Sequence, residues 1–405
     1  MAGPLSGIRV LDLSRVLAGP WASQCLADLG AEVIKVENPN GGDDTRTWGP
    51  PFFDEGEAPL SAYFMCANRG KHSVTIDIAK PEGQALVKRL AAESDIVIEN
   101  FKVGGLKKYG LDYTSLAEIN PGLIYCSITG FGQTGPYANR PGYDLLIQAL
   151  GGLMSITGEA DELPGGGPQR AGVAVTDLFT GLYSTVAIMG ALYHREKAGE
   201  GQHIDMALLD TQAAMLANQG SYFLVSGNAP KRQGNSHPTI VPYQSFATKD
   251  GHMILAVGND GQFARFCAAA GMPALAEDDR FRTNPSRVAH RDVLVPIVAG
   301  IIAGRTTDEW GDVLEAANVP GGPINTIDRV FANEQVKARG IELALKAKDG
   351  TLMPSVANPI RYSKSGIEYG KAPPMLGEDT DAVLSDVLGL SQQELALART
   401  GKVLG

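Results

Sequence analysis

The sequence predicts an α/β protein: a Rossmann-like large domain with a parallel sheet, joined to a smaller α+β domain. Three observations support this. Short apolar runs alternate with helical segments from residue 1 to about residue 135. A helix-rich region then extends to about residue 225, and a hairpin pattern with further helices follows a stretch rich in Gly, Asn, Pro and Ser. Strands that alternate with helices are typical of a mostly parallel sheet covered on both faces.

The first part of the chain begins with a βαβ pattern. A helix opening at Pro20 and ended by Gly30 separates the first two of five predicted strands, and a later helix covers residues 81–93. Apolar runs bounded by turn residues predict the strands at residues 8–13, 31–37, 73–78, 95–99 and 123–128.

The second part predicts a hairpin, with strands at residues 243–247 and 252–257. Helices are expected at about 260–270, 291–303 and 307–317. The resulting domain boundaries are a large domain over 1–200, a linker over 201–242, a small α+β domain over 243–325, a second linker over 326–345, and a C-terminal part over 346–405 that returns to the large domain.

Composition excludes some classes of partner. The chain has 405 residues, 44% hydrophobic and 20% charged, which is ordinary for a soluble globular protein. A net charge of −10 argues against a nucleic-acid-binding or membrane-binding surface. The four scattered cysteines indicate free thiols in a reducing cytoplasm, and the six histidines lack metal-ligand spacing, so we expect no metal.

Asp177 is the one formal charge between Arg170 and Arg195. A carboxylate in such an apolar run is costly unless it is hydrogen-bonded, paired or used chemically. One interpretation is a cap for a helix over residues 178–194, and another is a reactive acid; the two are compatible. The run 171–193 is long enough to span a membrane, but its glycines, threonines and acid favour a buried helix of a soluble protein.

Three loops follow predicted parallel strands, at residues 14–20, 100–104 and 129–132. Ligands of open parallel sheets bind beyond the carboxyl ends of the strands. Small residues in these loops, with Lys102, Lys107 and Lys108 nearby, suit an extended, phosphate-bearing ligand, although lysines are often only solvated. No GxGxxG follows the first strand and no P-loop motif occurs, so the sequence does not support a dinucleotide-binding fingerprint or a P-loop nucleotide site.

The chain resembles the class III CoA-transferases, the CaiB–BaiF family, from Pro4 to about Leu388. Several long runs in the family's order carry the resemblance. They are residues 15–20 (RVLAGP), 26–37 (LADLGAEVIKVE), 68–73 (NRGKHS), 99–101 (ENF), 126–131 (CSITGF), 142–144 (GYD), 172–178 (GVAVTDL), 194–197 (HREK) and 242–246 (PYQSF).

The resemblance implies roles for particular residues. It places the nucleophilic aspartate on Asp177, which would attack an acyl-CoA thioester and form a mixed anhydride. It places CoA contacts on Val16, Ala18, Asn100, Phe101 and Lys108, with Tyr143 beside the thioester. CoA or acyl-CoA would be a substrate, and no prosthetic group is expected.

We therefore expect a cytoplasmic CoA-transferase that moves CoA between succinyl-CoA and a small carboxylic acid, with dicarboxylic acids such as glutarate as the favoured acceptors. The far carboxylate needs a cationic contact, for which Arg46, Arg170 and His237 are hypotheses; each could instead be a surface or structural residue. The resemblance also implies an interlocked homodimer.

Two alternatives stay open. The first is an acyl-CoA racemase or isomerase on the same fold. It is disfavoured because racemases have histidine where Tyr143 stands, and the reference pKa of tyrosine is about 10. The second is a CoA-binding protein without catalysis. Within the family, Leu17, Asn38 and His237 depart from the pattern of formyl-CoA transferases, which argues against oxalate–formate chemistry.

Overall fold

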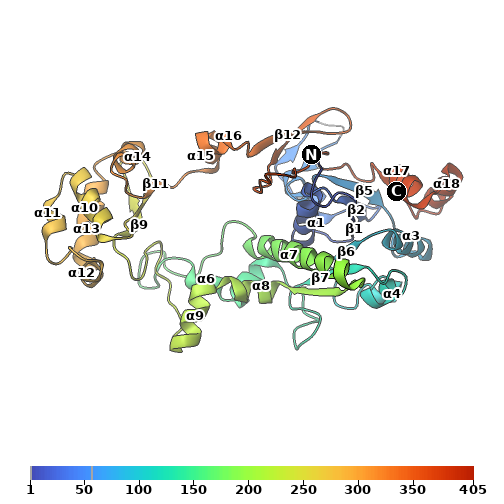
Figure 1. Cartoon of the computed structure of the whole chain (residues 1–405), viewed down its shortest axis with the longest axis horizontal. Coiled ribbons are helices and arrows are strands. Elements are labelled where there is room, and N and C mark those ends of the chain that lie inside the picture. Colours follow the sequence, from blue (N-terminus) through green and yellow to red (C-terminus); the bar gives the residue numbers. More distant parts are fainter. Residues whose placement is uncertain (1, 56–57) are drawn as a thin grey trace. The chain divides into compact units, whose positions relative to one another are not determined.

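The computed structural model describes residues 2–55 and 58–405 of the chain (Figure 1). The chain forms two compact units. The larger comprises residues 1–153, 171–225 and 335–405, and the smaller comprises residues 154–170 and 226–334. Each unit is described by itself.

A six-stranded, wholly parallel sheet forms the centre of the larger unit. This confirms the predicted fold class, and the order of the strands is that of a Rossmann fold, with the direction of progression reversing between β1 and β6. In spatial order the strands are β5 (Lys71–Thr75), β2 (Glu32–Glu37), β1 (Arg9–Asp12), β6 (Ile96–Glu99), β7 (Ile124–Thr129) and β8 (His203–Ala207).

Helices cover both faces of this sheet, as alternation along the strands requires. On β1, Val10 faces one core and Leu11 the other. The Val10 face packs against α1 (Ala18–Asp28), α5 (Asp144–Leu150), α7 (Val175–Ala198) and α8 (Leu208–Met215). The Leu11 face packs against α3 (Pro81–Ala92), α4 (Tyr113–Ala117), α17 (Thr380–Leu388) and α18 (Gln392–Thr400). Figure 1 shows α17 and α18, in red, beside α3.

Strand β8 differs from the prediction, which assigned residues 201–242 to a linker. It pairs in parallel with β7, and α8 follows it directly. An edge strand has one hydrogen-bonded neighbour and leaves part of its length in solvent, so His203 and Asp205 are exposed and break the apolar run. That polarity concealed the strand in the sequence. The division of the chain into a large domain, a small domain and two linkers stays a prediction.

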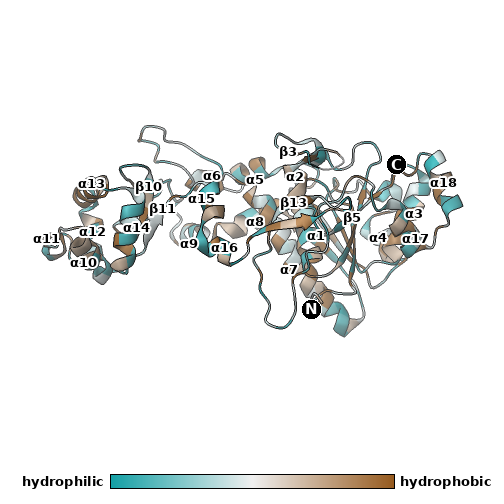
Figure 2. Ribbon diagram, turned by 90° about the horizontal axis from the view of Figure 1, so that it is seen from above, coloured by the Kyte–Doolittle hydropathy of each residue, from teal (hydrophilic) through white to brown (hydrophobic). Residues whose placement is uncertain are grey.

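The smaller unit contains an antiparallel sheet with the order β11-β10-β9 and its own core. The predicted hairpin is confirmed. Helix α13 is brown in Figure 2, and its Leu294, Val298 and Ile302 are fully buried. The elements are β9 (Tyr243–Ala247), β10 (His252–Ala256), β11 (Gly321–Pro323), α10 (Asp260–Ala269), α11 (Ala274–Glu277), α12 (Asn284–Ala289), α13 (Arg291–Ile302), α14 (Thr307–Ala316) and α15 (Ile327–Ala332).

Shorter elements complete the chain. They are η1 (Asp44–Thr47), β3 (Phe52–Phe53), β4 (Leu60–Ser61), α2 (Ala62–Met65), η2 (Lys107–Tyr109), α6 (Leu153–Ile156), α9 (Ala217–Ser226), α16 (Glu334–Ala338), β12 (Glu342–Lys346) and β13 (Leu352–Val356). The pairs β3–β4 and β12–β13 are both antiparallel.

Helix α7 is not the buried helix that the sequence predicts. It is long and apolar enough, by length and composition, to cross a membrane, yet only 39% of its most apolar 18-residue window is buried. Its inner side packs on α1 and the sheet, through Ile188 and Ala191. Its outer side exposes Leu182, Tyr183 and Val186. A helix with one packed and one exposed apolar side has a surface left to cover.

Candidate active site

A cleft of about 980 Å³ opens at the carboxyl ends of the parallel strands in the larger unit. The loops after β1 and β6, on either side of the point where the strand order reverses, both line it. This is the position where parallel α/β sheets bind their ligands. Asp177, on the first turn of α7, lies in the same wall.

The loop after β1 adopts an unusual backbone conformation at Val16, whose φ is +71°. A β-branched residue is rarely found in this left-handed region, so the surrounding structure must hold it there. Asp43 does so, because its two carboxylate oxygens each accept from the Val16 N–H at 3.2 Å. Lys35 also holds the loop, because its Nζ donates a hydrogen bond to the carbonyl oxygen of Ser14 at 2.8 Å.

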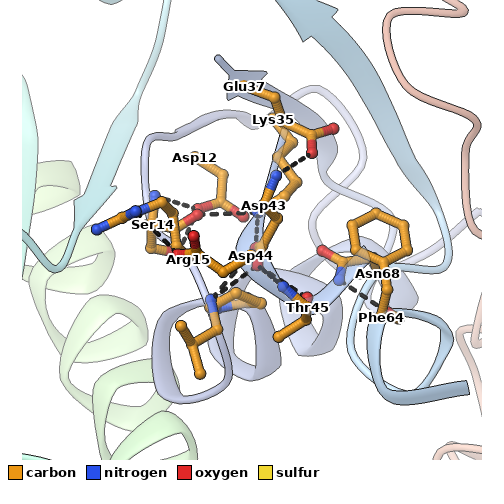
Figure 3. A network of polar contacts seen from close by, with 12 residues as sticks. Asp12, Ser14, Arg15, Lys35, Glu37, Asp43, Asp44, Thr45, Phe64 and Asn68 are labelled. Carbon is orange, nitrogen blue, oxygen red and sulfur yellow. Dashed lines mark hydrogen bonds and ion pairs between the residues drawn. The ribbon is translucent and has the colours of Figure 1, made fainter. Parts of the chain in front are cut away.

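Asp43 belongs to a buried network of opposite charges beneath this loop (Figure 3). Lys35 Nζ lies 2.9 Å from Asp43 Oδ2, and Lys71 Nζ lies 3.2 Å from Asp12 Oδ2; all four side chains are inaccessible to solvent. Burial alone would raise the pKa of Asp12, but the charges of Lys71 and Lys35 outweigh it and lower the pKa to about 2. The network is therefore ionised and fixes the first loop rigidly.

The loop after β6 is tied to the loop after β1 by one side chain. Asn100 accepts from the Arg15 N–H at 2.9 Å and donates from Nδ2 to the Arg15 carbonyl oxygen at 2.6 Å. Glu99 accepts from the Phe101 N–H at 2.7 Å. Helix α1 begins where the first loop ends, without a side-chain cap, so its first N–H groups are free to bind an anion.

Asp177 is not the helix cap that the sequence suggested. Helix α7 begins at Val175, its N-cap is Ala174, and Asp177 is its third residue. Asp144, at the start of α5, takes the capping role. Its Oδ1 accepts from the N–H groups of Thr176, at 2.9 Å, and Asp177, at 3.3 Å.

Burial and the charge of Asp144 raise the pKa of Asp177 to about 7, from an ordinary value of 3.8. Desolvation penalises the ionised form, and a second carboxylate nearby penalises it further. A carboxylate with a raised pKa is a stronger base, and hence a stronger nucleophile, than an ordinary aspartate. Its place in the cleft wall makes it available to a bound ligand.

The cleft brings the predicted CoA-contacting residues together. Val16, Ala18, Asn100, Phe101, Lys108 and Tyr143 all line it with Asp177. Tyr143 is 70% exposed and immediately precedes α5. Their contacts with CoA stay predictions.

Three further residues, Arg46, Arg170 and His237, were predicted to contact a far carboxylate. Arg46 is committed elsewhere: its Nε and Nη2 donate to Glu37 at 2.8 and 2.7 Å, and its Nη1 donates to the Pro374 carbonyl oxygen at 3.1 Å. It does not line the cleft. Arg170 and His237 belong to the smaller unit and stay predictions.

Sequence reasoning missed two aromatic residues near Asp177. Trp48 lines the cleft, and its ring packs edge-on against Tyr63, with centroids 5.1 Å apart. Burial first, and then the charge of Asp177, raise the pKa of Tyr63 to about 12. Trp48 directly follows η1 and Tyr63 lies on the four-residue helix α2, so neither residue is part of a periodic pattern. For Trp48, the aromatic character of residues 48–53 was the available signal. Among residues 2–55 and 58–405, no cluster of three or more His, Cys, Asp or Glu side chains could hold a metal ion.

Comparison with protein families gives a match to the model of CoA-transferase family III over residues 5–380. The succinate–glutarate CoA-transferase of Agrobacterium fabrum is 55% identical over 391 residues, which are 95% of this chain and 96% of that protein. The succinyl-CoA:glutarate CoA-transferase of Homo sapiens is 43% identical, over 95% of this chain and 86% of that protein. The sequence at residues 42–52 and 361–364 had suggested the same members of the family.

Among solved structures, a CaiB/BaiF family protein from Brucella suis is 51% identical and superposes with a TM-score of 0.89. The match covers 96% of this chain and all of that one. The resemblance inferred from the sequence runs is thereby confirmed.

Proposed function

Since the chain belongs to CoA-transferase family III, and so to the CoA-transferase class of enzymes, we propose that it moves CoA between succinyl-CoA and a small dicarboxylic acid. Glutarate is the first acceptor to test, because relatives at 55% and 43% identity carry names with that pair of acids. The observation that carries the proposal is Asp177, a carboxylate of raised pKa in the wall of the cleft.

Asp177 acts as the nucleophile. One of its oxygens attacks the thioester carbonyl carbon; the new C–O bond forms, the C–S bond breaks, and the electron pair leaves on sulfur as the CoA thiolate. The product on the enzyme is an aspartyl mixed anhydride. The incoming carboxylate then attacks the aspartyl carbonyl carbon of this anhydride; a new C–O bond forms, succinate leaves, and an aspartyl anhydride of the second acid remains. The CoA thiolate attacks the acyl carbon of that anhydride, the new C–S bond forms, and the Asp177 carboxylate is released. Low water access protects the anhydride from hydrolysis.

The loops after β1 and β6 hold CoA in this scheme. The uncapped N-terminus of α1, at Ala18, suits a phosphate group, and Lys108 adds a positive charge at the cleft. Asn100 and Phe101 complete this wall, and Tyr143 lies toward the thioester. Because Arg46 is paired with Glu37, Arg170 and His237 are the contacts proposed for the far carboxylate.

The active form is an interlocked homodimer in this proposal. Exposed apolar side chains on α5, α7 and α9 support it, since a monomer in water would leave them uncovered. They include Leu150, Leu182, Val186, Leu224 and Val225. The enzyme works in the cytoplasm without a prosthetic group, in keeping with its four free cysteines.

Incubation with succinyl-CoA and a panel of carboxylic acids, followed by mass spectrometry of the CoA esters, tests the function. We expect glutaryl-CoA and free succinate to appear together. Deuterium uptake at the α-carbon of a 2-methylacyl-CoA, without any acceptor acid, would instead indicate a racemase. Binding of CoA without exchange for any acid would indicate a protein without catalysis.

A further inference from the structure

We propose that Asp144 is a positioning residue for the transfer, which orients the first turn of α7 and places a second negative charge beside Asp177 to favour attack on the thioester. The inference rests on the proposed role of Asp177 as the nucleophile. Asp144 belongs to the run 142–144 that carries the family resemblance, but the sequence assigned it no role.

The geometry gives Asp144 two separate tasks. Its Oδ1 accepts from the Thr176 N–H at 2.9 Å and from the Asp177 N–H at 3.3 Å, so one atom fixes the backbone that carries the nucleophile. Its Oδ2 accepts from Gln148 Nε2 at 2.6 Å. Both oxygens therefore have defined partners, and the carboxylate cannot rotate away.

Gln148 completes a chain of contacts back to α7. It is fully buried, and its Oε1 accepts from the Ala171 N–H at 2.9 Å, just before α7 begins. The segment that leads into the helix is thus held at Ala171 by Gln148 and at Thr176 by Asp144. Two residues one turn apart on α5 together determine where Asp177 points.

The hydrogen bonds to Asp144 come from uncharged amide groups. Among residues 2–55 and 58–405, Asp144 takes part in no ion pair. Tyr63, on α2, also interacts with Asp177, and it stays neutral because its pKa is raised to about 12. The repulsion between the two aspartates is therefore not cancelled by a neighbouring cation.

This repulsion affects the free carboxylate of Asp177 but not the anhydride that it forms. Before attack, Asp177 carries a full negative charge beside Asp144. When its oxygen bonds to the acyl carbon, the electron pair leaves with sulfur and Asp177 becomes neutral, so the repulsion disappears. Asp144 thus raises the free energy of the free carboxylate but not that of the anhydride, and differential stabilisation of this kind speeds the step.

Asp144→Asn separates the two tasks. The amide oxygen can still accept from Thr176 and Asp177, but the charge is gone. Because the new amide nitrogen would meet the Gln148 amide nitrogen, a second variant combines Asp144→Asn with Gln148→Glu. The introduced carboxylate accepts from the new amide and from Ala171, which keeps the contacts and moves the charge one helical turn away. Asp386→Asn, an exposed acid on α17, is the matched control.

We expect kcat for succinyl-CoA and glutarate to fall about tenfold at pH 8 in Asp144→Asn. The acid limb of its pH profile should move to lower pH, and less Asp177 adduct should accumulate with succinyl-CoA alone. The double variant should keep the wild-type melting temperature and show the same direction of change in kcat and in the pH profile, and Asp386→Asn should match the wild type.

A folded Asp144→Asn enzyme with an unmoved pH profile and wild-type kcat would overturn the proposal. Failure of the proposed function would look different, because the wild type itself would then form no new CoA ester.

Discussion

Two groups of charged residues lie at the cleft, and they are built in opposite ways. Under the first loop, Asp12 and Asp43 are paired with Lys71 and Lys35, and the pKa of Asp12 falls to about 2. At the start of α7, Asp177 has a carboxylate for a neighbour, and its pKa rises to about 7. Compensated charges hold a loop in place, whereas an uncompensated charge is kept ready to react.

The two groups store unfavourable free energy in different places. The paired network carries the cost of holding Val16 at a φ of +71°, which shapes the ligand-binding loop before any ligand arrives. The repulsion between Asp144 and Asp177 also costs free energy, and it disappears when Asp177 becomes neutral in the anhydride. Removing a charge should therefore damage the first region through stability and the second through activity.

The largest effect is expected from Asp177→Asn. Without the nucleophile, no anhydride can form, so kcat should fall by roughly three orders of magnitude or more. CoA binding should be preserved because the new side chain has the same shape, and the melting temperature should be no lower than that of the wild type. Steady-state assays beside calorimetric CoA titration check this, and turnover near the wild-type rate would exclude the covalent route through Asp177.

Lys35→Met should break the compensated region. It leaves the fully buried Asp43 without its partner, and removing one member of a buried pair costs about 3–5 kcal/mol. The matched control is Arg9→Met, which breaks a partly exposed pair with Glu32 and should cost no more than about 1 kcal/mol. Urea unfolding measures both. Equal losses for the two variants would mean that the network does not stabilise the loop.

Stability should depend on pH through Asp177. Its pKa is about 7 when folded and near 3.8 when unfolded, so between these values the folded state binds more protons. The contribution of Asp177 to the free energy of unfolding should therefore be largest at pH 4 and fall as the pH rises to 7. Asp177→Asn should remove this loss, gaining on the order of 2 kcal/mol over the wild type at pH 8. Unfolding curves at pH 5 and pH 8 provide the test; a difference independent of pH would contradict a raised pKa.

The smallest effect is expected from Lys108→Ala. If Lys108 contacts a phosphate of CoA, the KM for succinyl-CoA should rise about fivefold with kcat nearly unchanged. Its neighbour Lys107 is also exposed but does not line the cleft, so Lys107→Ala is the control. The difference should shrink at high ionic strength. Identical KM values for the two variants would remove Lys108 from the CoA site.

The sequence was informative where a signal is local. Apolar runs located five strands of the main sheet, and the isolation of Asp177 in an apolar run marked it before any fold was known. It failed where a pairing depends on how the chain folds back on itself. Glu37 lies only nine residues before Arg46, but it is part of β2 and meets Arg46 only once the intervening loop has turned back. Asp144 lies 33 residues before Asp177, on another helix.

The most direct test of the central claim is to trap the covalent intermediate. Wild-type enzyme is incubated with succinyl-CoA and hydroxylamine, digested and analysed by mass spectrometry, with Asp177→Asn and enzyme without succinyl-CoA as controls. We expect a hydroxamate on Asp177 in the wild type alone, formed as free CoA is released. Continued CoA transfer with Asp177 unmodified, or with the label on another carboxylate, would contradict the account.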